Sequence, residues 1–342
     1  KRCERAACMT EKPVHPFSEP DGFKWGSFTN AKGADIRYGS LKADGESKGT
    51  VVMLPGFRES IEKYFEAARD MKERGFDVWL MDWRGQGGSE RYLQGSPQKM
   101  HHEGYDEQIE TLHQFTQNVV DKAPSGPMFM MAHSMGAHIG LRYLKEHEGI
   151  FDSAILSAPM LDINTGTLPK PLARQMAKFA KAGNYLDKYI PGGSDWSEEK
   201  NTFKDNNKTG DEARFNAALD ILKAKPDLKT GDPTYGWVYH TFQSIDILGQ
   251  EDYLKGIKTP VLMQISGHEN VVDRPAQERA AGLLPNCRRV DIADAQHEVW
   301  HEKDALRNAW LAEVDSFMAS RLPPPGLAPK KPDPSAPRPP KA

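Results

Sequence analysis

The sequence has 342 residues, of which 38% are hydrophobic and 27% are charged, and its formal net charge at pH 7 is −3. This length fits one large domain with insertions or two small domains. The weak negative charge disfavours a nucleic-acid-binding protein, which is usually strongly basic, and no run of 18 apolar residues predicts a membrane-spanning helix.

The N-terminal segment, residues 1–22, starts with basic residues but has no apolar core of the kind found in secretory signal peptides. We expect this segment to be flexible. The three cysteines, Cys3, Cys8 and Cys287, match neither a disulfide framework nor the spacing of a zinc site. Their number and placement favour a reducing, cytoplasmic location.

Between residues 23 and 320, short apolar runs alternate with segments of helical periodicity. This alternation is typical of an α/β fold, in which helices flank a mostly parallel central sheet whose buried strands are continuously apolar. The predicted strands are 50–54, 77–81, 127–132, 153–156, 261–265 and 289–292.

The segments between these strands place apolar residues on one helical face, as amphipathic helices do. In the first of them, Gly75 follows the last periodic residue and is a suitable C-terminal cap. The predicted helices are 61–74, 104–122, 134–146, 275–284 and 303–320.

The alternation is interrupted between about residues 162 and 245, a stretch rich in lysine and aspartate. Two pieces of it, 171–182 and 211–223, have amphipathic helical patterns. The first brings Leu172, Met176, Phe179 and Ala180 to one face, and the second does the same for Phe215, Leu219 and Leu222. We interpret the stretch as a helical cap inserted into a single domain. Part of its apolar surface is predicted to form a wall for an acyl chain.

The nucleophile candidate is Ser134, in the sequence Ala132-His133-Ser134-Met135-Gly136. It lies between a predicted strand and a predicted helix, which is the setting of a nucleophile elbow. The sharp turn of an elbow requires small neighbours, and Ala132 and Gly136 meet this requirement. The alternative role is an ordinary helix N-cap serine.

An oxyanion hole in such a fold uses two backbone N–H groups. One belongs to the residue after the nucleophile, here Met135, and the other to the loop after an earlier strand. Phe57 follows the Pro55-Gly56 turn at the end of strand 50–54 and is the candidate for the second donor. The alternative is an ordinary Pro-Gly turn.

The base and the acid are expected after the serine, in the order Ser, acid, His. His297 follows the last predicted strand and is the candidate base, with His301 as the alternative. The loop after strand 261–265 holds two candidate acids, Glu269 and Asp273. We favour Glu269 because it lies nearer the strand end, whereas Asp273 is placed to cap the next helix.

The C-terminal segment, residues 321–342, is rich in proline and almost free of apolar residues. Such a composition buries too little surface to offset the entropy of ordering, so we expect an extended, disordered tail. From Pro323 onward, four basic residues outweigh Asp333. A weak contact with an anionic membrane surface is the alternative to a purely solvated tail.

These motifs resemble the α/β-hydrolase superfamily, in particular its monoacylglycerol lipase and lysophospholipase L2-like branch. The resemblance rests on residues 54–60 with 63–64, on 75–78 with 82–89, on 133–136, and on 269–273. It extends over about residues 23–320 and is weak across the cap. Ala132 stands where this family more often has glycine, and the oxyanion loop differs at Phe57 and Arg58. In the lysophospholipases the acid position that matches Glu269 is a glutamate.

The resemblance implies a serine hydrolase that cleaves carboxylic esters of single-chain lipids, either lysophospholipids or monoacylglycerols, without a metal or organic cofactor. The alternatives are a short-chain carboxylesterase, another serine hydrolase such as a peptidase, or an acyltransferase of the same fold. A non-catalytic binding protein is a further alternative, which the presence of Ser134, His297 and Glu269 disfavours. The expected partner is a small-molecule or lipid ester, and no nucleic acid.

Overall fold

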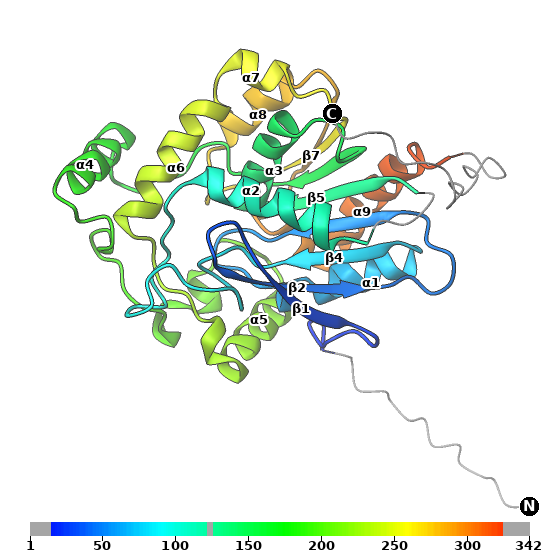
Figure 1. Ribbon diagram of the computed structural model, residues 1–342, viewed down its shortest axis with the longest axis horizontal. Helices are drawn as coiled ribbons and strands as arrows, with labels where there is room; N and C mark the ends of the chain where they lie inside the picture. Colours follow the sequence, from blue (N-terminus) through cyan, green and yellow to red (C-terminus); the bar gives the residue numbers. More distant parts are fainter. Residues whose placement is uncertain (1–14, 122–125, 324–342) are drawn as a thin grey trace, which may run out of the picture.

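The computed structural model describes residues 15–121 and 126–323 (Figure 1). Its centre is an eight-stranded sheet in the order β1-β2-β4-β3-β5-β6-β7-β8. The pairs β1–β2 and β2–β4 are antiparallel, and the pairs from β4 to β8 are parallel. The strands are β1 (Lys24–Thr29), β2 (Asp35–Leu41), β3 (Thr50–Leu54), β4 (Asp77–Met81), β5 (Met128–His133), β6 (Ser153–Ser157), β7 (Val261–Ser266) and β8 (Cys287–Ile292).

The six predicted strands are confirmed, with ends that differ by two residues or fewer. Strands β3 to β6 are buried along their whole length, as the continuous apolar runs indicate. The two strands β1 and β2 were not predicted. Strand β1 lies at the edge of the sheet and is largely exposed, so its sequence lacks the apolar run that marks an interior strand.

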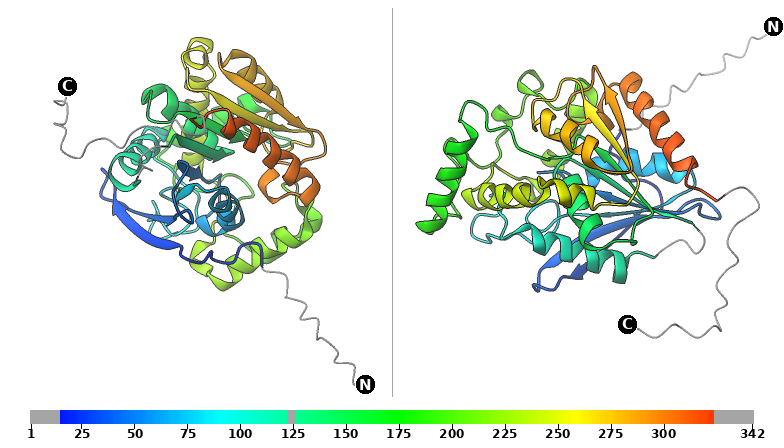
Figure 2. Two further views of the ribbon diagram at one scale, coloured as in Figure 1. Left: turned by 90° about the vertical axis from the view of Figure 1, so that its right-hand side faces the viewer. Right: turned by 90° about the horizontal axis from the view of Figure 1, so that it is seen from above.

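Helices cover both faces of the sheet (Figure 2). Helices α1 (Phe65–Glu73) and α9 (Asp304–Ala319) pack on one face. The other face is covered by α2 (Tyr105–Gln114), α3 (Met135–Glu146) and α8 (Arg274–Leu283). This three-layer arrangement confirms the predicted α/β fold class.

Two predicted helices are divided in the structure. The segment predicted as one helix over 61–74 begins with a 3₁₀ turn, η1 (Ile61–Tyr64), and continues as α1. The segment predicted over 104–122 comprises α2 and a π-helical turn, η2 (Phe115–Val119). Gly75 has φ 87°, a left-handed conformation that glycine adopts without steric cost, so its predicted role after α1 is confirmed.

The segment predicted as the cap lies between β6 and β7. Helices α4 and α6 pack against each other on one side of the molecule, and α5 lies apart from them (Figure 1). The apolar helix α6 was not predicted. The elements of this segment are α4 (Lys170–Ala182), η3 (Glu198–Lys200), η4 (Phe203–Asp205), α5 (Glu212–Ala224), η5 (Pro226–Leu228), α6 (Tyr235–Leu248) and α7 (Glu251–Lys255).

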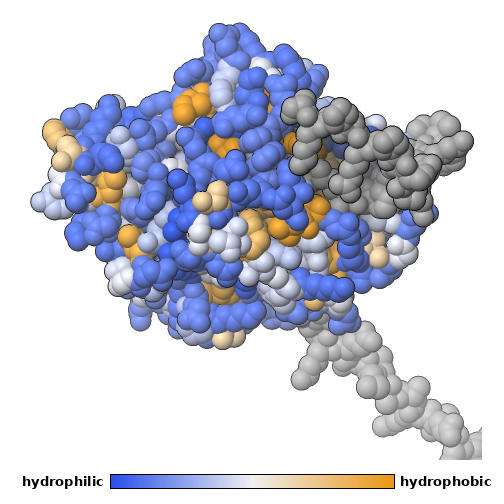
Figure 3. Space-filling model, in the orientation of Figure 1, coloured by the Kyte–Doolittle hydropathy of each residue, from blue (hydrophilic) through white to orange (hydrophobic). Residues whose placement is uncertain are grey.

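One part of the prediction for the cap is wrong. Leu172 and Phe179 of α4 are 50% and 66% exposed, so they do not face the interior with Ala180. Apolar residues are visible over α4 on a surface that is otherwise mostly hydrophilic (Figure 3). The predicted residues do lie near one another on α4. The side of the helix that faces the interior, however, is centred on Ala173 and Ala177.

The described residues include no helix that is both long and apolar enough to span a membrane. Most of the predicted flexible N-terminal segment, residues 1–14, and most of the predicted tail, residues 324–342, lie outside the described residues. The predictions for these two segments, including contact of the tail with a membrane, stay predictions.

Candidate active site

Ser134 lies at the turn between β5 and α3, with φ 50° and ψ −114°. This backbone conformation is strained for a residue with a side chain, and such strain is found at functional sites. A Cβ atom at Gly136 would lie 2.4 Å from the Leu54 carbonyl oxygen, so only glycine fits there. Ser134 itself is 5% exposed. The local sequence thus produces the elbow that the small neighbours predict.

The structure brings His297 and Glu269 to Ser134 in one hydrogen-bonded chain. The Ser134 hydroxyl lies 2.9 Å from His297 Nε2, and His297 Nδ1 lies 2.7 Å from Glu269 Oε2. A carboxylate accepts hydrogen bonds, so Nδ1 carries the proton and Nε2 is free to accept the serine hydrogen. The imidazole is therefore oriented so that its Nε2 can accept the Ser134 proton.

Glu269 is held in its ionised form. Its side chain is buried, which raises the carboxyl pKa, but the bond to His297 lowers it. The second carboxylate oxygen accepts the N–H groups of Val271 at 2.8 Å and Val272 at 3.1 Å. The net result is a pKa below the ordinary value, so this carboxylate is charged at neutral pH.

The two alternative residues lie elsewhere. Asp273 caps α8 by accepting the Ala276 N–H, and its other oxygen pairs with Lys170 at 2.5 Å. His301 has its Nε2 3.0 Å from the Lys63 carbonyl oxygen. Neither side chain takes part in the chain of hydrogen bonds that begins at Ser134. The geometry therefore favours Glu269 over Asp273 and His297 over His301.

The turn that carries Phe57 is fixed from behind by Gln86. Its side-chain amide donates to the carbonyl oxygens of Gly56 and Glu59, at 2.7 and 2.8 Å, and its oxygen accepts the Arg58 N–H. A Cβ at Gly56 would lie 3.2 Å from the Ser134 Cβ, which places this backbone beside the nucleophile candidate. This role of Gln86 was not predicted, because nothing local in its glycine-rich turn indicates it.

The two candidate oxyanion donors have free N–H groups. Within the described part of the chain, neither the Phe57 nor the Met135 backbone N–H donates a hydrogen bond. A buried N–H without a partner is rare in folded proteins. Met135 is buried and Phe57 is half-buried, and both line or adjoin the cavity at Ser134, so their free N–H groups are suited to the predicted oxyanion hole.

A cavity of about 620 Å³ opens at Ser134 and is lined mostly by apolar residues from the core and the cap. Trp237 of α6 packs on Phe57, with ring centroids 4.4 Å apart, at one wall. Ala173 and Met176 of α4 form part of another wall. The predicted cap face thus reaches this cavity through Met176. Phe215, Leu219 and Leu222 of α5 line a different cavity.

A buried ionic cluster lies behind the turn at residues 55–58, which carries the candidate donor Phe57 and is called the oxyanion turn below. Glu59 accepts hydrogen bonds from the Gly56 N–H at 2.6 Å and the Tyr64 hydroxyl at 2.5 Å. The Lys63 ammonium joins Glu59, at 2.8 Å, to Glu298, at 2.7 Å. Since Glu298 follows His297 in the chain, Lys63 connects the oxyanion turn to the loop of the candidate base. Only the i, i+4 spacing of Glu59 and Lys63 is visible in the sequence.

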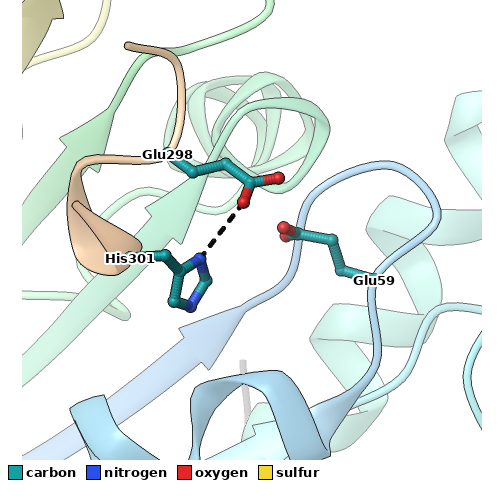
Figure 4. A group of neighbouring side chains, drawn as sticks. All are labelled: Glu59, Glu298 and His301. Atoms are coloured by element: carbon teal, nitrogen blue, oxygen red, sulfur yellow. Dashed lines mark ion pairs between the residues drawn. The ribbon is translucent and has the colours of Figure 1, made fainter. Parts of the chain in front are cut away.

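Among the described residues, Glu59, Glu298 and His301 form the one group whose spacing would suit a metal ion (Figure 4). His301 Nδ1 lies 3.4 Å from Glu298 Oε2. The Lys63 ammonium already lies between the two carboxylates and supplies the positive charge that they need. The residues therefore fit a lysine-centred cluster better than a metal centre.

Replacing Lys63 by Met is expected to lower the free energy of unfolding at pH 7 by about 3–5 kcal/mol, because two buried carboxylates lose their cation. Burial raises the pKa of Glu59, but Lys63 lowers it, and the result is about 2, below the ordinary 4.5. The stability from this carboxylate is complete above pH 4.5 and is lost as the pH falls toward 2.

Without Lys63 the buried carboxyls favour their protonated form, so the difference in stability between native protein and variant should narrow on acidification. Urea unfolding at several pH values measures this, with Lys24→Met at an exposed lysine of β1 as the control. Equal stability of Lys63→Met and the native chain at pH 7 would show that the cluster contributes nothing.

Comparison with known proteins places this chain among hydrolases. Residues 45–304 match the family described as serine aminopeptidase, S33. The chain is 33% identical over 301 residues to lysophospholipase L2 of Escherichia coli K12, and the match covers 85% of this chain and 86% of that protein. It is 26% identical over 156 residues to a monoacylglycerol lipase of Mycolicibacterium smegmatis, covering 45% and 54% of the two chains.

Two solved structures share the fold. A soluble variant of monoglyceride lipase from Saccharomyces cerevisiae superposes with a TM-score of 0.70 at 18% identity, over 92% of this chain and 99% of that one. A carboxyl esterase from Bacillus coagulans gives a TM-score of 0.67 at 18% identity, over 87% and 98%. At this level of identity the likeness establishes the fold.

Proposed function

Because the chain belongs to the serine aminopeptidase S33 family of α/β-hydrolases, in its lysophospholipase and monoacylglycerol lipase branch, we propose that it cleaves single-chain lipid esters through an acyl-enzyme. It is a carboxylic ester hydrolase of the serine type, and lipid esters are its class of substrate. The observation that carries the finer proposal is the hydrogen-bonded chain from Ser134 through His297 to Glu269 at the mouth of an apolar cavity.

In the first half of the proposed reaction, His297 Nε2 takes the proton of the Ser134 hydroxyl as Oγ attacks the ester carbonyl carbon. The negative charge that develops on the carbonyl oxygen is stabilised by the Phe57 and Met135 N–H groups, each worth about 3 kcal/mol. The tetrahedral intermediate then collapses. The bond to the alcohol oxygen breaks, and His297 gives that oxygen its proton.

In the second half, a water molecule takes the place of the alcohol beside His297. His297 accepts one of its protons, and the resulting hydroxide attacks the acyl carbon in the same oxyanion hole. The bond between the acyl carbon and Ser134 Oγ breaks, and the serine recovers its proton from His297. Glu269 stays ionised throughout and stabilises the imidazolium that forms twice per turnover.

The shape of the site supports a long acyl chain. The cavity at Ser134 holds about 620 Å³ and is apolar on most sides, whereas an acetyl group would leave nearly all of it empty. Transfer of each methylene from water into such a cavity is worth about 0.8 kcal/mol, or roughly fourfold in kcat/KM, until the cavity is full. A short-chain esterase gains nothing from this volume.

The proposal is tested with a fluorophosphonate probe and a set of substrates. The probe should label Ser134 in the native chain, and hydrolysis of a lysophospholipid and a monoacylglycerol should exceed that of an acetate ester. Efficient hydrolysis of acetate esters together with failure on both lipids would replace the proposal by a short-chain carboxylesterase.

Met176 of α4 provides a test of the acyl wall, because it lines the cavity whereas Phe179 on the same helix is 66% exposed. We expect Met176→Asp to lower kcat/KM for decanoate esters tenfold or more and to change kcat/KM for acetate esters little, since a carboxylate in the cavity wall opposes an apolar chain. The matched control is Phe179→Asp, which should preserve the chain-length dependence. A parallel loss for acetate and decanoate in Met176→Asp would contradict an acyl wall at α4.

A further inference from the structure

A second cavity, of about 100 Å³, lies between α5 and the oxyanion turn. The oxyanion turn lies between this cavity and the cavity at Ser134. Phe57 lines the cavity at Ser134, and the next residue, Arg58, lines the second one. Arg58 has φ 62°, a left-handed conformation that is uncommon for a residue with a side chain. The strained backbone at Arg58 therefore lies where the turn passes between the two cavities.

The carboxylates that line this second cavity are already occupied. Both oxygens of Glu59 accept hydrogen bonds within the ionic cluster described above, and the oxygens of Glu298 face Lys63 and His301. Arg214, which also lines the cavity, is paired with Glu66 and other acidic neighbours. The charged atoms of these side chains are therefore not available to bind a ligand.

Three hydrogen-bond donors on the cavity wall remain available. Among the described residues, the Lys208 ammonium has no hydrogen-bond or ion-pair partner, and the buried Trp196 Nε1 has no acceptor. Arg58 has one distant partner, Asp232, at 3.4 Å. Burial lowers the pKa of Arg58, and Asp232 compensates only in part. Donors without acceptors on one cavity wall indicate a site for an anion.

The cavity reaches the loop that carries the candidate base. Glu298, adjacent to His297, lines it, and the Glu298 N–H donates to the Lys208 carbonyl oxygen at 2.7 Å. The leaving alcohol must lie beside the imidazole, because His297 protonates its oxygen. Lys208 is thereby fixed next to the loop that the alcohol portion of a substrate would contact.

We propose that Lys208, Arg58 and Trp196 Nε1 form a subsite for the phosphate of a lysophospholipid head group, with the acyl chain in the cavity at Ser134. This inference rests on the proposed function and narrows it. A monoacylglycerol has no anion for these donors, so the subsite selects lysophospholipids over monoacylglycerols. Arginine and lysine are the residues that recognise phosphate oxygens most strongly.

The test compares a lauroyl lysophospholipid with lauroyl glycerol, both below their critical micelle concentrations and in phosphate-free buffer. The measured quantity is the ratio of the two kcat/KM values. Lys208→Met should lower this ratio about tenfold through loss of one charge-assisted hydrogen bond. Lys204→Met, at an exposed lysine of η4, is the matched control and should leave the ratio unchanged. An unchanged ratio in Lys208→Met with normal thermal stability would overturn the proposal.

A second measurement does not depend on turnover. Glycerol 3-phosphate and inorganic phosphate are titrated calorimetrically into Ser134→Ala and into the same chain with Lys208→Met added. Binding of glycerol 3-phosphate that Lys208→Met abolishes supports the subsite. Binding of inorganic phosphate alone, with an unchanged substrate ratio, identifies a site for free anions and overturns the head-group assignment. If the native enzyme hydrolyses neither lipid, the proposed function fails, and the calorimetry alone decides the anion site.

Discussion

Replacing Ser134 by Ala is expected to lower kcat for lipid ester hydrolysis by about a million-fold, and His297→Ala by a similar factor. The serine oxygen forms the covalent bond to the acyl group in the proposed mechanism, and among the described residues His297 is the one base within hydrogen-bonding distance of it. Alanine and serine have the same backbone restrictions at φ 50°, so the variant should fold as the native chain does. Steady-state kinetics and circular dichroism measure the two effects.

A control for this substitution is Ser316→Ala, at an exposed serine of α9, which should retain full activity. The Ser134→Ala chain should also lose covalent labelling by a fluorophosphonate while keeping its thermal stability. Turnover close to the native rate by a folded Ser134→Ala chain would refute the assignment of the nucleophile.

Glu269→Gln is expected to lower kcat by about ten thousand-fold. The glutamine amide can donate a hydrogen to His297 Nδ1, which favours the tautomer with its proton on Nε2. That tautomer cannot accept the serine proton. The uncharged amide also gives no electrostatic support to the imidazolium. The measurement is kcat for hydrolysis of a chromogenic ester as a function of pH.

Asp273→Asn is the matched comparison, since it also converts one acid of the same loop to its amide. Asparagine still caps a helix, so α8 keeps its N-terminal hydrogen bond. The lost pair with Lys170 is partly exposed and contributes less than about 1 kcal/mol. Activity should stay within a few-fold of native. A larger loss for Asp273→Asn than for Glu269→Gln would reverse the choice of acid.

The interior of the fold was predictable because burial determines composition there. Strands β3 to β6 are enclosed by helices on both faces, and each is a continuous apolar run. The edge strand β1 is exposed and carries no such pattern. In α4 the helical period groups Met176 with Phe179, yet Met176 lines the cavity at Ser134 and Phe179 is exposed. Periodicity gives neighbours on a helix, but only tertiary packing decides which of them faces inward.

For the candidate site, local steric demands made Ser134 recognisable, since a strained turn restricts its neighbours to small residues. His297 and Glu269 were reached through the order of strands in the fold. The cluster around Lys63 joins residues more than 230 positions apart, and no spacing in the sequence connects Glu298 to Glu59. The anion subsite proposed at Lys208 was unpredictable for the same reason, because its residues from the cap and the core meet only after folding.

The hydrogen bond from Ser134 to His297 joins residues 163 positions apart, and β8, which precedes His297, occupies the edge of the sheet beside β7. During synthesis the ribosome therefore completes the serine elbow long before the imidazole exists. At translation rates of about 5–20 residues per second, this interval lasts roughly 8–33 s. In the proposed mechanism the nascent chain lacks the base that activates Ser134 during that period, so esterase activity should arise only when the last strand is released. Premature termination anywhere before residue 297 would yield an inert polypeptide rather than an unregulated lipase.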